Sequence, residues 1–332
     1  MNDNDNTFLS VKDLVVEYTS NRQIVHAVNG VSFDIRRGRT LGLVGETGAG
    51  KTTIARAIIG ILQMPPASIK GGEIIFEGED LLKKSQEEMQ KIRGDQIAMI
   101  FQDPMTALNP LMNVGDQIAE MVRIHNPHLS RKQLEERAME MLEMVGIPKE
   151  RYIEYPFQFS GGMKQRVVIA IALACNPKLL LADEPTTALD VTIQAQILNI
   201  IKDLQKKQNA SLLLITHDLG VVAETCDDVA VIYAGQIIEY GSKERIFLNP
   251  THPYTLGLFG SLPIMNKGKD RLQPIKGMMR SPLLPIEGCP FYERCSEATQ
   301  QCRTTNVEMK EIAPGHFCRC LNKEKEGEEW II

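Results

Sequence analysis

The strongest constraint on this chain is a glycine-rich segment that reads Gly45-Glu46-Thr47-Gly48-Ala49-Gly50-Lys51-Thr52-Thr53. It matches G-x-x-x-x-G-K-[ST], the pattern of a phosphate-binding loop. Residues 40–44 before it are strand-like, and residues 54–62 after it repeat apolar side chains at helical spacing. In this context backbone N–H groups turn towards a phosphate chain at the positive end of a helix. Lys51 would contact the β- and γ-phosphates, and the Thr52 hydroxyl would bind Mg²⁺. The segment therefore predicts a nucleoside triphosphate site.

Length and composition are those of an ordinary globular protein. The chain has 332 residues, 43% hydrophobic and 24% charged, which predicts one large domain with an extension, or two domains. The net charge of −5 gives no general reason to expect a nucleic-acid partner. No apolar run approaches the roughly 20 residues of a membrane span. Residues 1–6 are polar and acidic, unlike a secretory signal. We therefore expect a cytosolic location, where thiols stay reduced.

Strand and helix patterns alternate along most of the chain. Strands are expected at residues 9–18, 24–35, 71–78, 96–101, 178–182, 211–215, 229–233 and 236–239. Residues 105–160 (approximate limits) carry an apolar stripe at helical spacing and no strand signal, which predicts a helical insertion. The alternation predicts an α/β fold with a mostly parallel sheet and ligands at the carboxyl ends of its strands. Prolines interrupt every regular pattern near the end, so the predicted domains are residues 1–247 and a loop-rich extension at 248–332.

Polar side chains follow three of the expected buried strands. Asp183 and Glu184 close one strand; the first could hold Mg²⁺ opposite Thr52, and the second could deprotonate an attacking water. Gln102 follows another strand and has the amide chemistry to bridge the metal and that water. His217 follows a third and could donate a hydrogen bond to a γ-phosphate. These strand ends are expected to converge on one catalytic site.

A second phosphate-binding surface is predicted at Ser160-Gly161-Gly162, which opens a buried helix with a hydroxyl and free N–H groups. One nucleotide does not need two such surfaces from one chain. The economical arrangement is a head-to-tail dimer, in which this segment of each chain closes over the nucleotide of the other. Tyr18 lies about one hairpin before the phosphate-binding loop, so its ring could stack on an adenine or belong to the core.

Taken together, these motifs resemble the full set of an ABC transporter ATPase. The matching segments are residues 45–52, Gln102, residues 159–163, residues 180–185, Ala188-Leu189-Asp190 and His217. The resemblance covers residues 8–247 in order, and Phe159 and Met163 depart from the commonest signature sequence. It implies a P-loop NTPase (RecA-like) core with an antiparallel β subdomain and a helical insertion.

The resemblance also implies roles for individual residues. Tyr18 would stack on the adenine of ATP, and Glu184 would be the catalytic base. Ser160 and Gly162 would contact the γ-phosphate bound by the partner subunit. Gln102 and the helical insertion would touch the membrane subunits.

Two segments of the extension narrow the resemblance to the dipeptide/oligopeptide branch of importers. They read Asn249-Pro250-Thr251-His252-Pro253-Tyr254-Thr255 and Gly288-Cys289-Pro290-Phe291-Tyr292-Glu293-Arg294-Cys295. This implies an ATPase subunit at the cytoplasmic face of the membrane, with an identical or paralogous second ATPase subunit. Two permease subunits and, indirectly, an extracytoplasmic peptide-binding protein would be its partners. Nickel or oligosaccharide cargo remains an alternative, as does a soluble ABC ATPase that acts on DNA or ribosomes.

Five cysteines gather in the extension. They are spaced Cys289-x5-Cys295-x6-Cys302, followed by Cys318 and Cys320. Four thiolates could hold a zinc ion or a [4Fe–4S] cluster. The resemblance implies the cluster, with Cys320 as the fourth ligand because it follows Gly315-His316 by four positions, and zinc stays the alternative. We expect the metal to staple a tail that has little apolar material of its own. We also expect ATP binding to be independent of this tail, since no phosphate motif lies beyond His217.

Overall fold

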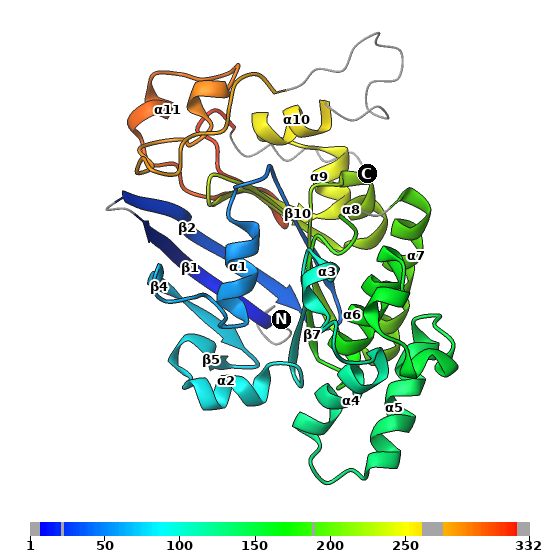
Figure 1. Ribbon diagram of the computed structural model, residues 1–332. Helices are drawn as coiled ribbons and strands as arrows, with labels where there is room; N and C mark the ends of the chain where they lie inside the picture. The colour runs from blue at the N-terminus through cyan, green and yellow to red at the C-terminus, as the bar shows by residue number, and fades with distance from the viewer. Residues whose placement is uncertain (1–6, 21–22, 188–189, 261–274, 324–332) are drawn as a thin grey trace.

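Two sheets form the framework of the molecule in the computed structural model, which describes residues 7–20, 23–187, 190–260 and 275–323 (Figure 1). The smaller sheet has four antiparallel strands in the order β2-β1-β4-β5. Its strands are β1 (Thr7–Ser20), β2 (Gln23–Arg36), β4 (Ala67–Phe76) and β5 (Glu79–Asp80). It provides the antiparallel β subdomain that the resemblance implies.

The larger sheet has eight strands in the order β11-β12-β10-β9-β3-β8-β7-β6. Its parallel part consists of β3 (Thr40–Val44), β6 (Ile97–Ile100), β7 (Leu179–Asp183), β8 (Ser211–Thr216) and β9 (Asp228–Tyr233). Strands β10 (Gln236–Ser242), β12 (His316–Cys318) and β11 (Lys310–Ala313) continue it in antiparallel fashion. Every residue of β3, β7 and β8 is buried, because this part of the sheet is covered on both faces.

The two faces of the larger sheet belong to two separate hydrophobic cores. Along β8, Leu212 and Leu214 join the core on the side of the helical insertion. Leu213 and Ile215 join the core shared with the smaller sheet and α1 (Lys51–Ile58). This alternation is the side-chain period of a strand, so the apolar run of β8 serves both cores.

Helices fill the chain between β6 and β7, as the sequence predicts. They are α3 (Pro104–Ala107), α4 (Val114–His125), α5 (Arg131–Met144) and α6 (Gly161–Leu173), and α4 and α5 project at the lower right of Figure 1. Helix α5 begins with a capping box between Ser130 and Gln133. Its predicted apolar stripe, Leu134, Ala138, Met141 and Leu142, is buried. Before α10 the chain also forms α2 (Gln86–Ile92), α7 (Val191–Gln208), α8 (Leu219–Thr225) and α9 (Lys243–Leu248).

The extension is more regular than its prolines predict. It contains α10 (Pro253–Gly260), α11 (Gln301–Thr304), β11 and β12. Pro253 is the first residue of α10, a position where the missing N–H leaves no helical bond unmade. Strand β12 pairs with β10, so the extension continues the larger sheet across the predicted boundary at 247 and 248.

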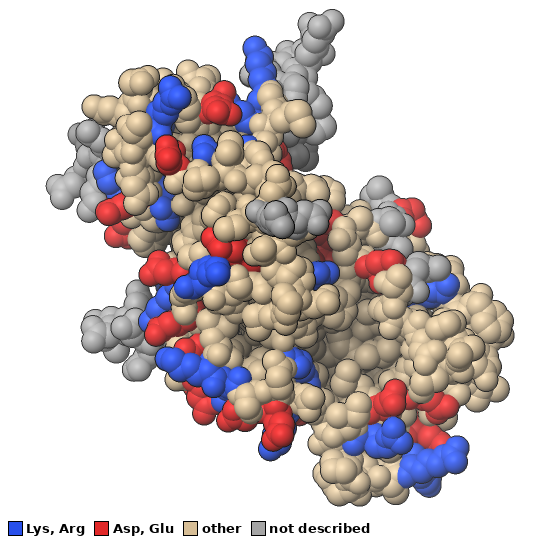
Figure 2. All heavy atoms as spheres, turned by 60° about the vertical axis from the view of Figure 1, so that its left-hand side comes forward, with Lys and Arg blue, Asp and Glu red and all other residues tan. Residues whose placement is uncertain are grey.

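The surface carries both signs of charge. On the face in Figure 2, acidic and basic side chains are interspersed over the described residues. None of the helices in the described ranges is long and apolar enough to cross a membrane.

Candidate nucleotide-binding site

The predicted phosphate-binding loop joins β3 to α1 at the carboxyl end of the parallel sheet. Two of its glycines are required by close backbone approaches. A Cβ at Gly45 would lie 2.2 Å from the Ile232 carbonyl oxygen, and one at Gly50 would lie 2.4 Å from that of Ala27. Gly50 also has a φ of 100°, a conformation that favours glycine. The local sequence thus forms a tight turn that residues with side chains would disrupt.

Lys51 is held inside this loop. Its side chain is only 5% exposed, and Nζ donates hydrogen bonds to the carbonyl oxygens of Gly45 at 2.7 Å and Glu46 at 3.0 Å. Burial lowers the pKa of Lys51, while the nearby Glu184 and Asp183 act in the opposite direction. The ammonium group therefore lies where the loop would surround a phosphate chain.

Thr52 and Asp183 form the predicted magnesium pair. The Thr52 hydroxyl donates to Asp183 Oδ1 at 3.1 Å, at the end of β7. Burial raises the pKa of the Asp183 carboxyl, and the Thr52 hydrogen bond opposes this rise. A hydroxyl and a carboxylate side by side are hard oxygen donors that fit Mg²⁺, which usually takes its other ligands from phosphates and water.

Glu184 lies beside the other two predicted catalytic residues, Gln102 and His217. Its Oε2 accepts hydrogen bonds from Gln102 Nε2 at 3.0 Å and from the Thr187 hydroxyl at 2.9 Å. Its Oε1 lies 3.4 Å from His217 Nδ1. The Glu184 side chain is 13% exposed, and its backbone has a left-handed φ of 46°. Thr187 was not among the predicted residues, although a hydroxyl three residues after the carboxylate was the available signal.

Tyr18 lies on β1 beside the phosphate-binding loop. Its hydroxyl shares a hydrogen bond of 3.2 Å with Thr53 Oγ1. The ring is half-buried and packs against the core between the two sheets. The contact places the aromatic ring next to the first turn of α1 and leaves part of it accessible.

The Ser160-Gly161-Gly162 segment begins α6 on the side of the insertion. Ser160 is the N-cap, and its hydroxyl accepts a hydrogen bond of 3.4 Å from the Met163 N–H. Ser160 and Gly161 are exposed, and a Cβ at Gly162 would lie 2.6 Å from Ile193 Cγ2. No hydrogen bond within the described ranges links Ser160 to residues 45–53 of the same chain. Ala188 and Leu189 of the related motif lie outside the described residues.

The predicted metal staple is not supported. Cys295, Cys302 and Cys320 do lie near Cys289, since each of them adds to the rise in the pKa of Cys289 that burial causes. Burial, the main cause, raises the pKa of Cys289 to about 11. All seven cysteines are described, yet no group of three or more His, Cys, Asp or Glu among the described residues has the geometry to hold a metal ion. The structure therefore shows neither the [4Fe–4S] cluster nor a zinc site at these cysteines, and both stay predictions.

The extension is anchored by packing that the sequence argument missed. Phe291, Cys289, Cys302 and Val307 belong to the main hydrophobic core. Arg319 donates from its backbone N–H to the Ile238 carbonyl at 2.8 Å, in addition to the β10–β12 pairing. The extension therefore has apolar material and strand partners, which removes the reason for expecting a metal to hold it together.

Two residues of the extension reach the phosphate-binding loop, and the sequence did not predict either. The Arg294 guanidinium donates to both carboxylate oxygens of Glu46, at 2.8 and 3.0 Å. The Tyr254 hydroxyl accepts from the Glu46 N–H at 3.0 Å. Both residues lie more than 200 positions away in sequence, so no local pattern could have indicated these contacts.

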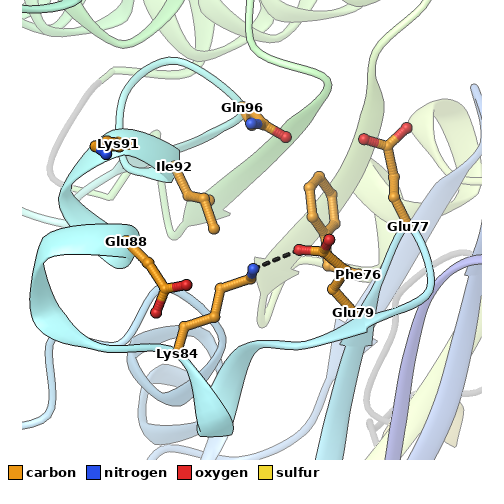
Figure 3. A pocket seen from close by; sticks show the side chains of 8 residues that line it. All are labelled: Phe76, Glu77, Glu79, Lys84, Glu88, Lys91, Ile92 and Gln96. Atoms are coloured by element: carbon orange, nitrogen blue, oxygen red, sulfur yellow. Dashed lines mark hydrogen bonds and ion pairs between the residues drawn. The ribbon is translucent and has the colours of Figure 1, made fainter.

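A separate pocket of about 400 Å³ contains none of these residues (Figure 3). Its lining consists of Phe76, Glu77, Glu79, Lys84, Glu88, Lys91, Ile92 and Gln96. Lys84 and Glu79 form an ion pair there. The pocket lies between the smaller sheet and α2 and is not part of the nucleotide site.

Comparison with known proteins decides the family. A family model described as "ABC transporter" matches residues 28–187, and one described as "Oligopeptide/dipeptide transporter, C-terminal region" matches residues 238–302. The oligopeptide transport ATP-binding protein OppD of Bacillus subtilis is 50% identical over 94% of this chain and 87% of its own length. The dipeptide transport ATP-binding protein DppD of Bacillus subtilis is 46% identical over 98% and 97%, respectively. The chain belongs to the dipeptide/oligopeptide branch of the ABC transporter ATP-binding subunits.

A solved structure confirms the ABC ATPase fold. The ATP-binding cassette MJ0796, in a dimeric post-hydrolysis state bound to ADP and Pi, aligns with a TM-score of 0.65. It is 26% identical and covers 71% of this chain and 99% of its own. The mixed α/β sheets are those of a P-loop NTPase, and the activity of this ABC transporter ATPase is ATP hydrolysis coupled to transport by the complex.

Proposed function

We propose that this chain is the ATP-hydrolysing subunit of a peptide importer, with Glu184 as its catalytic base. The observation that carries the proposal is the hydrogen-bonded group around Glu184, next to the Thr52–Asp183 pair. A general base must be held within hydrogen-bonding reach of the proton that it removes. Glu184 is oriented by two donors on Oε2, Gln102 and Thr187, and His217 Nδ1 lies 3.4 Å from its Oε1.

The other residues of the site have complementary roles in this proposal. Lys51 and the backbone of residues 45–53 bind the β- and γ-phosphates. Thr52, Asp183 and Gln102 would hold Mg²⁺, which when bound would neutralise developing charge on the phosphates. Glu184 takes a proton from the attacking water. His217, which is 62% exposed, donates a hydrogen bond to the γ-phosphate.

A second ATPase subunit completes each site in the proposed complex. Ser160, Gly161 and Gly162 present a helix N-terminus to solvent rather than to their own chain's phosphate-binding loop. The similar cassette MJ0796 is dimeric with ADP and Pi bound. A head-to-tail dimer would bring this segment of each subunit to the γ-phosphate on the other, and the partner is identical or a paralogue.

An apolar groove of about 490 Å³ supports the proposal that the chain binds a membrane subunit. It lies between α2, β6, α4 and α6, and Phe101, immediately before Gln102, is part of its lining. Ile124 also lines it and is 61% exposed. A helix of a permease subunit, with an apolar face, fits an apolar groove of this kind. The chain would then lie peripherally at the cytoplasmic face, with the permease linking it to an extracytoplasmic peptide-binding protein.

Peptides are the proposed cargo because the named relatives are oligopeptide and dipeptide transport proteins and the C-terminal region matches that branch. Nickel and oligosaccharide remain rival cargoes, and a soluble ABC ATPase without permease partners is the more distant rival. In this proposal residues 1–247 are the ATPase and residues 248–332 an extension that shares its larger sheet. The [4Fe–4S] cluster at the four cysteines, with zinc as its alternative, stays a separate prediction and supplies no step of ATP hydrolysis in this proposal.

Co-purification followed by uptake tests the proposal. The tagged chain should bring down two permease subunits. Proteoliposomes containing the complex and its binding protein should accumulate labelled peptide only when ATP is present on the side of the membrane that carries the ATPase subunits. The Lys51→Ala complex is the matched control and should transport nothing. Uptake of nickel or an oligosaccharide in place of peptide would contradict the cargo, and purification without any permease would contradict the transporter role.

A further inference from the structure

All polar groups of Glu46, in its backbone and in its carboxylate, take part in hydrogen bonds. Its N–H donates to the Tyr254 hydroxyl at 3.0 Å, and its carbonyl accepts from Lys51 Nζ at 3.0 Å. Its carboxylate accepts both hydrogen bonds of the Arg294 guanidinium. Hydrogen bonds therefore link Glu46 both to Lys51 of the phosphate-binding loop and to the extension.

Arg294 is itself rigidly held. Its side chain is 7% exposed, and Nε donates to the Lys276 carbonyl at 3.0 Å. Its guanidinium carbon lies 5.7 Å from the centre of the Tyr233 ring and 5.8 Å from that of Phe291. A bidentate pair in such surroundings fixes orientation as well as charge. The hydrogen bond to Glu46 is the main cause of the raised pKa of Arg294.

A second part of the extension borders the same loop. A Cβ at Gly48 would lie 3.0 Å from Met279 Cε. Close by, the His26 N–H donates to the Pro282 carbonyl at 2.8 Å. Met279 and Arg294 of the extension therefore lie against the loop at two positions, Gly48 and Glu46.

We propose that Arg294 is a positioning residue for the phosphate-binding loop, so that the extension forms part of the nucleotide site. Arg294 fixes the Glu46 carboxylate, which fixes the carbonyl that holds Lys51. It also neutralises a negative charge that would otherwise repel the triphosphate. The inference deepens the ATPase activity and does not depend on peptide as cargo. It replaces the expectation that ATP binding is independent of the tail.

Coupling of this kind is reciprocal. If the extension shapes the loop for nucleotide, then bound nucleotide must stabilise the contact with the extension by the same free energy. A non-hydrolysable ATP analogue should therefore slow proteolysis within residues 275–323 of the full chain. The protection should be lost when Arg294 is changed to Met, a side chain of similar length without charge.

The decisive experiment measures ATP affinity, KM and kcat for Arg294→Met, Arg294→Lys, Glu46→Gln and the double variant Glu46→Gln/Arg294→Met in the full chain. Arg294→Met should weaken ATP binding and raise KM about tenfold, with kcat at saturating ATP within about twofold. Arg294→Lys should recover part of the affinity because it restores the charge. The double variant should bind ATP no less tightly than whichever single variant binds it less tightly. Arg303→Met, at an exposed arginine of the same extension, is the matched control and should match wild type.

Several results would overturn the proposal. An unchanged KM in Arg294→Met or in Glu46→Gln would do so, as would strictly additive effects in the double variant. If Arg294→Met did not fold, Glu46→Gln alone would decide, because it keeps Arg294 and its contacts with Tyr233, Phe291 and Lys276. None of these measurements involves peptide transport, so failure of the cargo assignment would leave them unaffected.

Discussion

Glu184 shows how a single residue can be prepared for proton transfer. It follows the last residue of β7, and its backbone N–H donates to the Ile215 carbonyl at 2.9 Å on the neighbouring strand. The left-handed φ of 46° is a strained conformation for a glutamate, of the kind found at functional sites. Two donors on Oε2 and one neighbour on Oε1 then restrict the side chain. The end of the strand, the backbone conformation and the side-chain partners together fix the orientation of the Glu184 carboxylate.

Tyr18 gives a prediction at the same scale. Tyr18→Ala should weaken ATP binding roughly 5- to 100-fold, because aromatic stacking on a base contributes about 1–3 kcal/mol. Tyr18→Phe is the matched control: it keeps the ring and loses only the hydrogen bond to Thr53, so its affinity should stay within about threefold. Equilibrium titration with a fluorescent ATP analogue measures both. Wild-type affinity in Tyr18→Ala would show that the ring is a core residue and nothing more.

The predicted site residues that lie at strand ends could be placed from the sequence, whereas Arg294 could not. Asp183 ends one strand of the parallel sheet and Glu184 and His217 follow strands of it, and the carboxyl ends of such strands meet at one edge. Their meeting follows from local patterns alone. Arg294 reaches Glu46 across 248 positions and from outside that pattern. A contact of this kind depends on how the extension packs, which no periodicity records.

At the scale of elements, the extension is attached through β12 and a buried polar group. Glu239 of β10 is fully buried, and its carboxylate lies 2.8 Å from His316 Nε2 of β12. It also accepts the N–H groups of Thr251 and His252, just before α10. The alternating strands and helices of the core were predictable because each has a clear period. β11 and β12 were not, because they are short and lie among prolines and cysteines.

The apolar groove gives a prediction about elements. Ile124→Glu should reduce co-purification with the permease subunits at least tenfold, because it places a charge in the apolar groove that we propose as their docking site. ATP binding by the isolated subunit should be unchanged. Ile153→Glu is the matched control, since Ile153 is 73% exposed and does not line the groove. A normal complex with Ile124→Glu would show that the permease docks elsewhere.

At the scale of the whole molecule, the larger sheet and its core unite the ATPase and the extension. β12 covers one edge of β10, and Phe291, Cys289 and Cys302 complete a core that begins in the helical insertion. Removing residues 249–332 should therefore lower Tm by at least about 10 °C, since several buried side chains contribute about 1.5–3 kcal/mol each. Circular dichroism melting of the truncated and full chains measures this. An unchanged Tm would mean that the extension is an independent domain.

The most direct test of the account is the oligomeric state and turnover of Glu184→Gln in the presence of ATP and Mg²⁺. Loss of the base should lower the rate of phosphate release at least about a hundredfold while ATP still binds. The unreacted nucleotide should then hold two subunits together through Ser160-Gly161-Gly162, giving an ATP-bound dimer by light scattering. The double variant Lys51→Ala/Glu184→Gln should stay monomeric, as should Glu184→Gln without nucleotide. Phosphate release at the wild-type rate, or an ATP-bound monomer at concentrations where the wild type is active, would contradict the account.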